Sequence, residues 1–470
     1  MRQQQEGRTK ACSNRTWLSA VLGLAAGAIV GVLAVGVAGA TVGGRAANER
    51  PTAVLEATHV PPLLIVGEQA AELRYDAYCI TADESEESCR ISGEVYIRQR
   101  DRGGFQVLPL ALDQSADEGR YVARVPPRIA SSPSGFTYYA VLRDELHNVQ
   151  TVLPAAGAGS PQRSLPLGDS ALVDLGAHAF GRPRVPTERV VRAAWGNGPD
   201  EVGLEKGRNL IPIGGTAFDV NDAGTVSVLD EAHRRLLRWT GSDAEPTPVA
   251  LAIDGTLADM AVDDEGAIYI LESGGGSASE RLLRIFGPDG APRARGPVAE
   301  RADQLRLGPE GTVVLAQPSG QWISTTANGR LLTPASQHLS GRPGRPVRGG
   351  RGTEVVVDRV ANEIRVALVG GNSVRRSWRV TSETPLAEVQ LAEPVGSRLV
   401  LVARVYTDRE DEFVVLVLGA RGVEESFSLE SADWAETAPL SRFRVAGSSL
   451  YQLGSTPMGL FVDRFRLELQ

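Results

Sequence analysis

Hydrophobic residues follow two patterns along the chain. From residue 16 to residue 44 no position is charged, and Leu, Val, Ala and Gly dominate the run. A helix of about 20 apolar residues crosses the hydrocarbon core of a bilayer, so this run predicts a transmembrane helix at residues 17–44. A cleaved signal peptide is the alternative, because Ala38-Gly39-Ala40 has the small residues of a cleavage site.

The segment before this helix sets its orientation. Residues 1–16 contain Arg2, Arg8, Lys10 and Arg15 against the single acidic Glu6. Because positively charged flanks stay in the cytoplasm, we expect residues 1–16 to form a cytoplasmic tail. The rest of the chain is then extracytoplasmic, and the protein is expected to be a single-pass protein of the cell membrane.

Small residues recur at every fourth position of the predicted helix, at Ser19, Gly23, Gly27 and Gly31. Such a stripe lets two helix backbones approach closely, so it predicts a homodimer through the membrane helix. The alternative is that a Gly- and Ala-rich span produces this spacing by chance.

After the helix the pattern changes to short segments of alternating hydrophobic and polar residues. We expect residues 45–60 to form a stalk and residues 61–153 to form a β-sandwich, since several short strands at near-regular spacing are typical of that fold. The predicted strands lie at residues 71–79, 94–98, 106–110, 120–125, 136–143 and 149–153. Tyr138 and Tyr139 should point to opposite faces of their sheet, one into the core. In its general pattern, and without a site motif, the region resembles an immunoglobulin-like or fibronectin-type module.

The C-terminal part of the chain repeats itself after a predicted linker at residues 154–188, which holds one short element at 171–175. Residues 218–230 and 260–272 align without a gap, each as a strand, a polar turn ending in glycine, and a second strand. Four weaker units follow, and the six turn glycines recur every 41–51 residues: Gly224, Gly266, Gly311, Gly352, Gly396 and Gly447. This period predicts a β-propeller at residues 189–470 with about six four-stranded blades.

A strand-like segment at residues 190–195 precedes the first full unit. It has the character of the outer strands at residues 235–239 and 281–286, which end the first two units. We expect it to complete the last blade by pairing with the final strand of the chain, at residues 460–469. Closure of this kind removes the sheet edges that would otherwise invite pairing with other chains.

The first two units resemble NHL repeats. The shared features are a Phe-Asp-Val or Ala-Val-Asp strand, a turn closed by glycine, a second strand ending in an acidic residue, and an arginine-rich outer strand. The resemblance covers residues 189–290 and weakens over residues 300–470. It implies a propeller, and some propellers of this kind are enzymes that hold a metal ion on the central axis with His, Asp, Asn or Glu ligands.

Charge and cysteine content narrow the classes of partner. The chain has 49 basic and 57 acidic residues and a formal charge of −8, which argues against a nucleic-acid partner because phosphate binding needs a basic surface.

Cys79 and Cys89 lie in the expected extracytoplasmic part, where disulfides persist, and we expect them to pair. The loop between them carries four acidic residues, but it lacks the ligand spacing of an EF-hand calcium site and indicates a solvated loop.

Candidate chemistry in the propeller is sparse. The carboxylates Asp219, Asp263, Asp230 and Glu272 could surround an axial cation, with turn capping as the alternative. His233 and His338 do not occupy equivalent positions of two units, so a zinc site with three protein ligands is not expected. No nucleophile elbow or phosphate-binding loop lies in a suitable context. We therefore predict no catalytic residue, no metal ligand and no cofactor.

One arginine-rich stretch is a candidate ligand-binding loop. Arg342, Arg345, Arg348 and Arg351 lie within ten residues and could bind an acidic ligand or polymer, with an exposed loop between blades as the alternative.

Together these patterns predict an all-β protein with an N-terminal transmembrane helix, a small β-sandwich and a β-propeller of about six blades. Propellers usually present loops on one face to a partner, so we expect a binding or scaffolding protein with a protein or polymer partner at the propeller face. The bias to arginine over lysine suggests a bacterial cell surface. The alternative is a propeller hydrolase or lyase acting on an extracytoplasmic substrate. A sensor is a third possibility, for which a 16-residue tail leaves little room.

Overall fold

A computed structural model describes residues 53–469 except 67–70, 82–89, 115–118, 208–210, 243, 274–280, 300–301, 351, 372, 432–433 and 437–440. All the described residues belong to one compact unit, residues 46–470. The predicted tail, the membrane helix at 17–44 and its stripe of Ser19, Gly23, Gly27 and Gly31 lie outside the described residues. Within the described ranges, no helix is both long and apolar enough to cross a bilayer.

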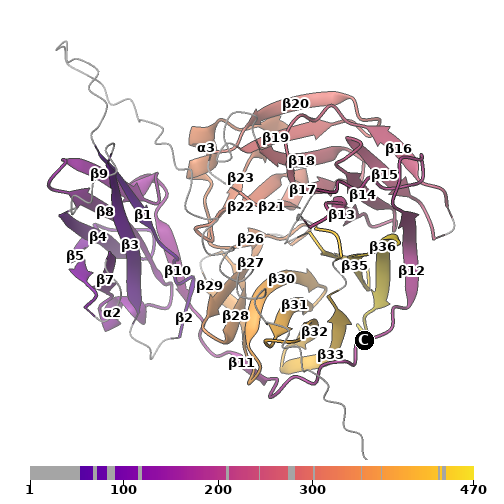
Figure 1. Ribbon diagram of the computed structural model, residues 1–470. Helices are drawn as coiled ribbons and strands as arrows, with labels where there is room; N and C mark the ends of the chain where they lie inside the picture. The colour runs from indigo at the N-terminus through magenta and orange to yellow at the C-terminus, as the bar shows by residue number, and fades with distance from the viewer. Residues whose placement is uncertain are drawn as a thin grey trace, which may run out of the picture. The chain divides into compact units, whose positions relative to one another are not determined.

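Two sheets enclose the core of the first region, residues 53–166 (Figure 1). One sheet has the order β1-β3-β7-β6, and the other has the order β2-β10-β8-β4-β5 with β9 beside β8. The elements are β1 (Ala53–Thr58), β2 (Leu64–Ile65), β3 (Glu72–Thr81), β4 (Ile91–Gln99), β5 (Gln106–Pro109), β6 (Ala111–Leu112), β7 (Arg120–Arg124), α2 (Pro127–Ala130), β8 (Phe136–Asp144), β9 (Val149–Leu153), η1 (Gly157–Gly159) and β10 (Gln162–Pro166). Strands occupy all six segments predicted for this region.

Alternation along β8 explains how this core forms. Phe136, Tyr138, Ala140 and Leu142 are fully buried and belong to one apolar cluster, because every second side chain of a strand faces the same side of the sheet. Tyr139 faces the other side, where its ring stacks on Tyr96 with the ring centroids 4.8 Å apart. The prediction that Tyr138 and Tyr139 point to opposite faces is confirmed.

The structure corrects the predicted stalk and linker. Residues 53–58 of the predicted stalk form β1, which pairs antiparallel with β3, and Leu55 joins the core. Residues 162–166 of the predicted linker form β10, which pairs with β8. Both segments alternate over only a few residues, which made their periodicity hard to separate from irregular chain. Cys79 lies on β3, but Cys89 lies outside the described residues, so their pairing stays a prediction.

Six sheets of three to five strands form a ring in the second region, where four strands were expected in each (Figure 1). We call these sheets blades 1 to 6 in chain order, and we give the strands of each blade from the innermost to the outermost. Blade 1 is β13 (Gly215–Val220), β14 (Val226–Asp230), β15 (Arg235–Trp239) and β16 (Thr247–Ala250); blade 2 is β17 (Leu257–Val262), β18 (Ile268–Ser273), β19 (Arg281–Phe286) and β20 (Pro292–Pro297); blade 3 is β21 (Gln304–Leu307), β22 (Val313–Ala316) and β23 (Trp322–Ser324). Blade 4 is β26 (Arg345–Pro346), β27 (Thr353–Val360), β28 (Glu363–Gly370) and β29 (Ser373–Thr381); blade 5 is β30 (Leu386–Val395), β31 (Arg398–Tyr406), β32 (Asp411–Gly419) and β33 (Gly422–Glu430); blade 6 is β34 (Phe443–Ala446), β35 (Ser449–Thr456), β36 (Gly459–Arg466) and β12 (Glu188–Ala194). A hairpin of β24 (Thr326–Ala327) and β25 (Arg330–Leu331), the helix α3 (Pro334–Leu339) and the turn η2 (Pro309–Gly311) complete the region.

The ring closes in the way that the sequence predicts. β12 pairs antiparallel with β36, so the first strand of the region completes the blade that the last strands begin. The six predicted turn glycines all adopt positive φ angles, between 58° and 81°, in the turn that follows the innermost strand of each blade. Glycine adopts this conformation without the steric penalty of a Cβ atom, which explains its recurrence.

An additional strand from the predicted linker lies on blade 4. β11 (Ala171–Asp174) pairs with β29 in parallel orientation and makes this sheet five-stranded. Val173 is buried against blade 4, whereas Leu172 is exposed on the opposite face. Part of the predicted linker is therefore an outer strand of the propeller.

Candidate functional site

Four charged side chains from the innermost strands of four blades lie together in the propeller. They are Asp219 on β13, Asp259 on β17, Arg306 on β21 and Arg444 on β34. Asp259 is fully buried, and the other three side chains are at most 14% exposed. We call these four residues the axial cluster.

Asp259 is the centre of the axial cluster because it accepts five hydrogen bonds. They come from the backbone amides of Met260 (2.8 Å) and Leu305 (2.8 Å), from Arg306 Nη1 (2.8 Å), from Arg444 Nη2 (3.2 Å) and from the Ser441 hydroxyl. Both carboxylate oxygens are thus satisfied, as a buried charge requires.

Asp219 contacts the guanidinium group of Arg444 at a different nitrogen from Asp259. The Nε atom of Arg444 lies 3.3 Å from Asp219 Oδ1, so one guanidinium group contacts both carboxylates. Asp219 also accepts the backbone amides of Val220 (3.0 Å) and Val262 (2.7 Å). The second of these bonds joins blade 1 to blade 2.

Burial shifts the ionisation of two members of the axial cluster. It raises the pKa of the Asp219 carboxyl, and the positive charge of Arg444 opposes that shift. Burial, together with the neighbouring charge of Arg444, lowers the pKa of Arg306 to about 10. Arg306 therefore remains protonated at neutral pH, and two arginines balance two carboxylates in a site with little solvent.

The other carboxylates that were candidates for an axial cation lie elsewhere. Asp263 caps a turn, because it accepts the backbone amide of Ala267 (2.7 Å). Asp230 contacts Arg235 Nε and His233 Nδ1, both at 2.8 Å. Glu272 is buried against Arg284. Asp230 and Glu272 are in equivalent positions, as predicted, but each contacts an arginine of its own blade.

The described arginines of the arginine-rich stretch contact three separate carboxylates. Arg342 Nη1 lies 3.3 Å from Glu354, buried Arg345 bonds Glu393 (2.7 Å) from the short strand β26, and Arg348 contacts Asp264 in the turn of blade 2. Arg351 lies outside the described residues. Three of the four candidate ligand-binding arginines are therefore already paired with separate carboxylates, which does not support a shared ligand-binding loop.

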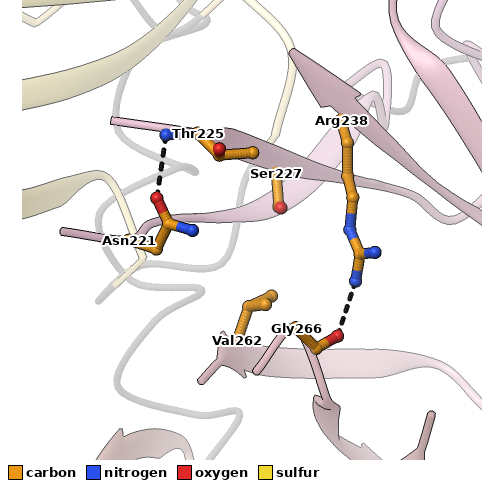
Figure 2. A pocket seen from close by; sticks show the side chains of 6 residues that line it. All are labelled: Asn221, Thr225, Ser227, Arg238, Val262 and Gly266. Carbon is orange, nitrogen blue, oxygen red and sulfur yellow. Dashed lines mark hydrogen bonds between the residues drawn. The ribbon is translucent and has the colours of Figure 1, made fainter. Parts of the chain in front are cut away.

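A small polar pocket lies between blades 1 and 2, lined by Asn221, Thr225, Ser227, Arg238, Val262 and Gly266 (Figure 2). The guanidinium of Arg238 closes one side, where it donates to the carbonyl oxygens of Gly266 (2.8 Å) and Pro288 (2.7 Å). Asn221 accepts the backbone amide of Thr225 (2.9 Å) on the opposite side. Because Arg238 belongs to blade 1 and both acceptors belong to blade 2, its role is to join the two blades.

A larger groove lies between blades 4 and 5, beneath residues 175–184, which we call the connecting segment. Its apolar lining includes Val405 and Val414, on the face of blade 5 that packs toward blade 4, and Phe427, on the opposite face of the same blade. Its polar side chains are His178, Arg182, Arg184, Ser382, Ser426 and Ser428. A concave site with an apolar floor and a few polar groups is the usual form of a small-ligand site.

The connecting segment is held in place by bonds to blade 5 and to the loop that joins blades 4 and 5. The backbone amide of His178 donates to Thr384 Oγ1 (2.8 Å), that of Gly181 donates to Glu412 Oε1 (2.7 Å), and that of Arg184 donates to the Ser428 carbonyl (2.8 Å). The wall of the groove is therefore formed before any ligand binds.

Ser428, His178 and Glu412 do not form a catalytic triad. Nε2 of His178 lies 2.9 Å from Glu412 Oε2 and 3.5 Å from Ser428 Oγ, so the carboxylate and the hydroxyl face the same ring nitrogen. A general base needs the carboxylate on one nitrogen and the nucleophile on the other. This arrangement orients His178 and does not activate Ser428.

Sequence reasoning missed both the axial cluster and the groove. In the alignment of the first two units, Asp219 is equivalent to Ala261. Asp259 lies two residues before Ala261, on the same face of the strand, so the alignment did not pair it with Asp219. Arg306 and Arg444 come from blades in which the repeat motif is weak. One wall of the groove is the connecting segment, which lies in the predicted linker. The only sequence signal of regular structure near it was the alternating pattern of residues 171–175.

No family model matches the sequence, and no curated protein matches it. Similar solved structures include virginiamycin B lyase from Staphylococcus aureus (TM-score 0.33, 10% identity, covering 54% of this chain and 96% of that chain). Others are a PQQ-bound aldose sugar dehydrogenase from Streptomyces coelicolor (0.34, 11%, 60% and 97%) and the calcium-binding protein regucalcin from Agrobacterium tumefaciens (0.32, 11%, 55% and 93%). These are β-propeller-like proteins. At such TM-scores the likeness carries no argument about activity.

Proposed function

We propose that this chain is a non-catalytic binding or scaffolding protein, with residues 17–44 as a membrane anchor and the sandwich and propeller outside the cytoplasm. In this proposal the stripe of Ser19, Gly23, Gly27 and Gly31 pairs two anchors in a homodimer. The partner is a protein or polymer that binds the propeller.

The state of the propeller axis is the observation that carries this proposal. Asp219 and Asp259 converge there from neighbouring blades, as the ligands of an axial cation would, but Arg306 and Arg444 neutralise them. An ion at this position would have to displace two buried guanidinium groups and leave them without a counter-charge, which is strongly unfavourable. The geometry therefore supports a structural axis, and it disfavours the alternative in which a metal-dependent hydrolase or lyase acts there.

Metal titration of the full-length protein in detergent tests this proposal. We expect calorimetry with Ca²⁺, Mn²⁺ and Zn²⁺ to give the same binding curves for the wild type and for Asp219→Asn, because Arg444 occupies the carboxylate of Asp219. The matched control is Asp222→Asn, an exposed carboxylate in the turn after β13. Stoichiometric binding that Asp219→Asn abolishes and Asp222→Asn retains would overturn the proposal in favour of the enzyme.

The expected orientation has its own test. A reporter that is active only in the cytoplasm, fused after Gln470, should be inactive, whereas a reporter that needs an extracytoplasmic environment should be active at the same position. The physical reason is the positive charge of residues 1–16, which retains that end inside. Cytoplasmic activity of the first fusion would contradict the orientation and the membrane-surface role together.

A further inference from the structure

We propose that the small pocket between blades 1 and 2 binds a small neutral polyol, a molecule with hydroxyl groups on neighbouring carbon atoms. The pocket has a volume of about 90 Å³. A single water molecule needs about 10–15 Å³ of such space, so the pocket has room for a ligand of several non-hydrogen atoms. The inference goes beyond the proposed function, because it depends neither on the membrane anchor nor on the axial cluster.

The pocket lies where the apolar contact between blades 1 and 2 ends. Ala217, Leu229 and Leu236 of blade 1 pack against blade 2 in one buried apolar cluster. Two residues further toward the turns, the same face of blade 1 carries Ser227, which lies opposite Arg238 in the pairing of β14 with β15. A small side chain and a polar side chain thus follow the apolar ones, and they leave a hollow between the two blades.

Four polar groups around this hollow have no hydrogen-bond partner among the described residues. They are the hydroxyl of Ser227, which is only 2% exposed, the hydroxyl of Thr225, the NH2 group of Asn221 and Nε of Arg238. Asn221 accepts the Thr225 amide through Oδ1, so its NH2 group faces the pocket, as Figure 2 shows. Arg238 bonds blade 2 only through Nη1 and Nη2. Since buried polar groups normally have partners, these four indicate a polar occupant.

The second repeat unit shows that the hollow is not a general feature of the blades. In the alignment of the first two units, Tyr269 stands where blade 1 has Ser227, and Asp263 stands where it has Asn221. The Tyr269 hydroxyl donates to Asp263 Oδ2 (3.0 Å), so a phenol ring with its own partner occupies the equivalent place. The serine of blade 1 leaves this place open.

The charges around the pocket favour a neutral ligand. A cation would lie against the guanidinium group of Arg238, which lines the pocket. Burial lowers the pKa of Arg238, and the negative charge of nearby Asp263 opposes that shift. The exposed carboxylates Asp222 and Glu265 lie in the two turns that border the pocket, so an anion would meet negative charge at its entrance.

Hydroxyl groups match the partners that the pocket offers. The NH2 group of Asn221 and Nε of Arg238 can only donate, whereas the hydroxyls of Ser227 and Thr225 can donate and accept. A ligand hydroxyl also does both, so it can accept from an N–H group while it donates to a hydroxyl oxygen. Val262 gives the C–H groups of a polyol an apolar contact.

Ligand-detected NMR on the full-length protein tests this inference, in a detergent without a sugar head group and in a buffer free of glycerol. We expect saturation-transfer spectra to show saturable binding of glycerol. The matched probes are 1-propanol, with one hydroxyl on the same carbon chain, and glycerate, in which a carboxylate replaces one CH2OH group. Each should bind at least about threefold more weakly than glycerol. Absence of saturable glycerol binding would mean that the pocket holds only water and would overturn the inference, and glycerate binding as tight as that of glycerol would overturn the neutral class.

Variants locate the binding. Ser227→Ala and Thr225→Val each remove a hydroxyl that bonds no described residue, so both variants should fold. Each should weaken glycerol binding about two- to tenfold, the effect of one lost hydrogen bond. Ser242→Ala, in the exposed turn between β15 and β16, is the matched control and should bind as the wild type does. A loss in either variant places glycerol in the pocket, and unchanged affinity in both would place it elsewhere and contradict the site.

Discussion

Replacing Asp259 with alanine is expected to lower the free energy of unfolding of the propeller by about 3–5 kcal/mol, because it leaves buried charges without a partner. Arg306 and Arg444 both contact Asp259, and Asp219 alone would remain to balance them. The amide of Leu305 and the hydroxyl of Ser441 would also lose their acceptor. Chemical denaturation of wild type and variant, followed by tryptophan fluorescence, measures the change.

An exposed carboxylate is the control for this prediction. Asp222→Ala removes the same charge from the turn after β13 and should change the free energy of unfolding by no more than about 0.5 kcal/mol. A change of less than about 1 kcal/mol for Asp259→Ala would mean that the axial cluster relaxes or admits water, and the description of a structural axis would then be wrong.

Acid is expected to destabilise the β-sandwich through His59 as the pH falls from about 6.5 to about 4. Burial lowers the pKa of His59 from 6.5 to about 4, although a hydrogen bond to the Arg74 carbonyl opposes the shift. That carbonyl can only accept, so Nδ1 donates to it (2.6 Å) and Nε2 accepts the Tyr138 hydroxyl (2.8 Å). The ring also stacks on Tyr75, with 4.2 Å between centroids. The folded state thus selects the neutral imidazole.

The sign of the effect follows from proton binding. Between pH 4 and 6.5 the unfolded chain binds a proton at His59 and the folded chain does not, so stability is lost as the pH falls. His59→Gln cannot titrate, and the stability difference between wild type and this variant should shrink across that range. Denaturant unfolding at several pH values measures it, and His338→Gln on α3 is the control that keeps the wild-type dependence. A difference that stays constant with pH would show that His59 titrates alike in both states.

The sequence predicts the repeated blades and their closure better than it predicts the side-chain contacts between blades. The turn glycines could be found because each sits where only a positive φ closes the turn, so the residue type itself marks the position. Closure by residues 190–195 could be predicted because a ring needs a final outer strand. Glycine spacing, however, says nothing about which side chains meet on the inner strands. Asp259 and Arg444 are 185 residues apart, and only the closed ring brings them into contact.

The short strands were not predicted from the sequence for a different reason. β1 and β10 have six and five residues, and so short an alternation is hard to distinguish from loop. β11, with four residues, was expected only as one short element within a linker. Each is stabilised by its pairing with a longer strand, namely β3, β8 and β29. The groove was missed with them, because its wall begins directly after β11. Pairing partners far away in the sequence, and not local preference, determine these segments.

The pairing of β12 with β36 also has a consequence for the order of events during synthesis. Residues 171–194 leave the ribosome long before the strands that they pair with, since β11 waits for β29 and β12 waits for β36. Until then two strands present open edges, which are prone to pair with other chains. The ring cannot close before β36 has been made. We therefore expect closure to be a late event in synthesis, and we expect the open edges of the nascent chain to need protection from aggregation until β36 has left the ribosome.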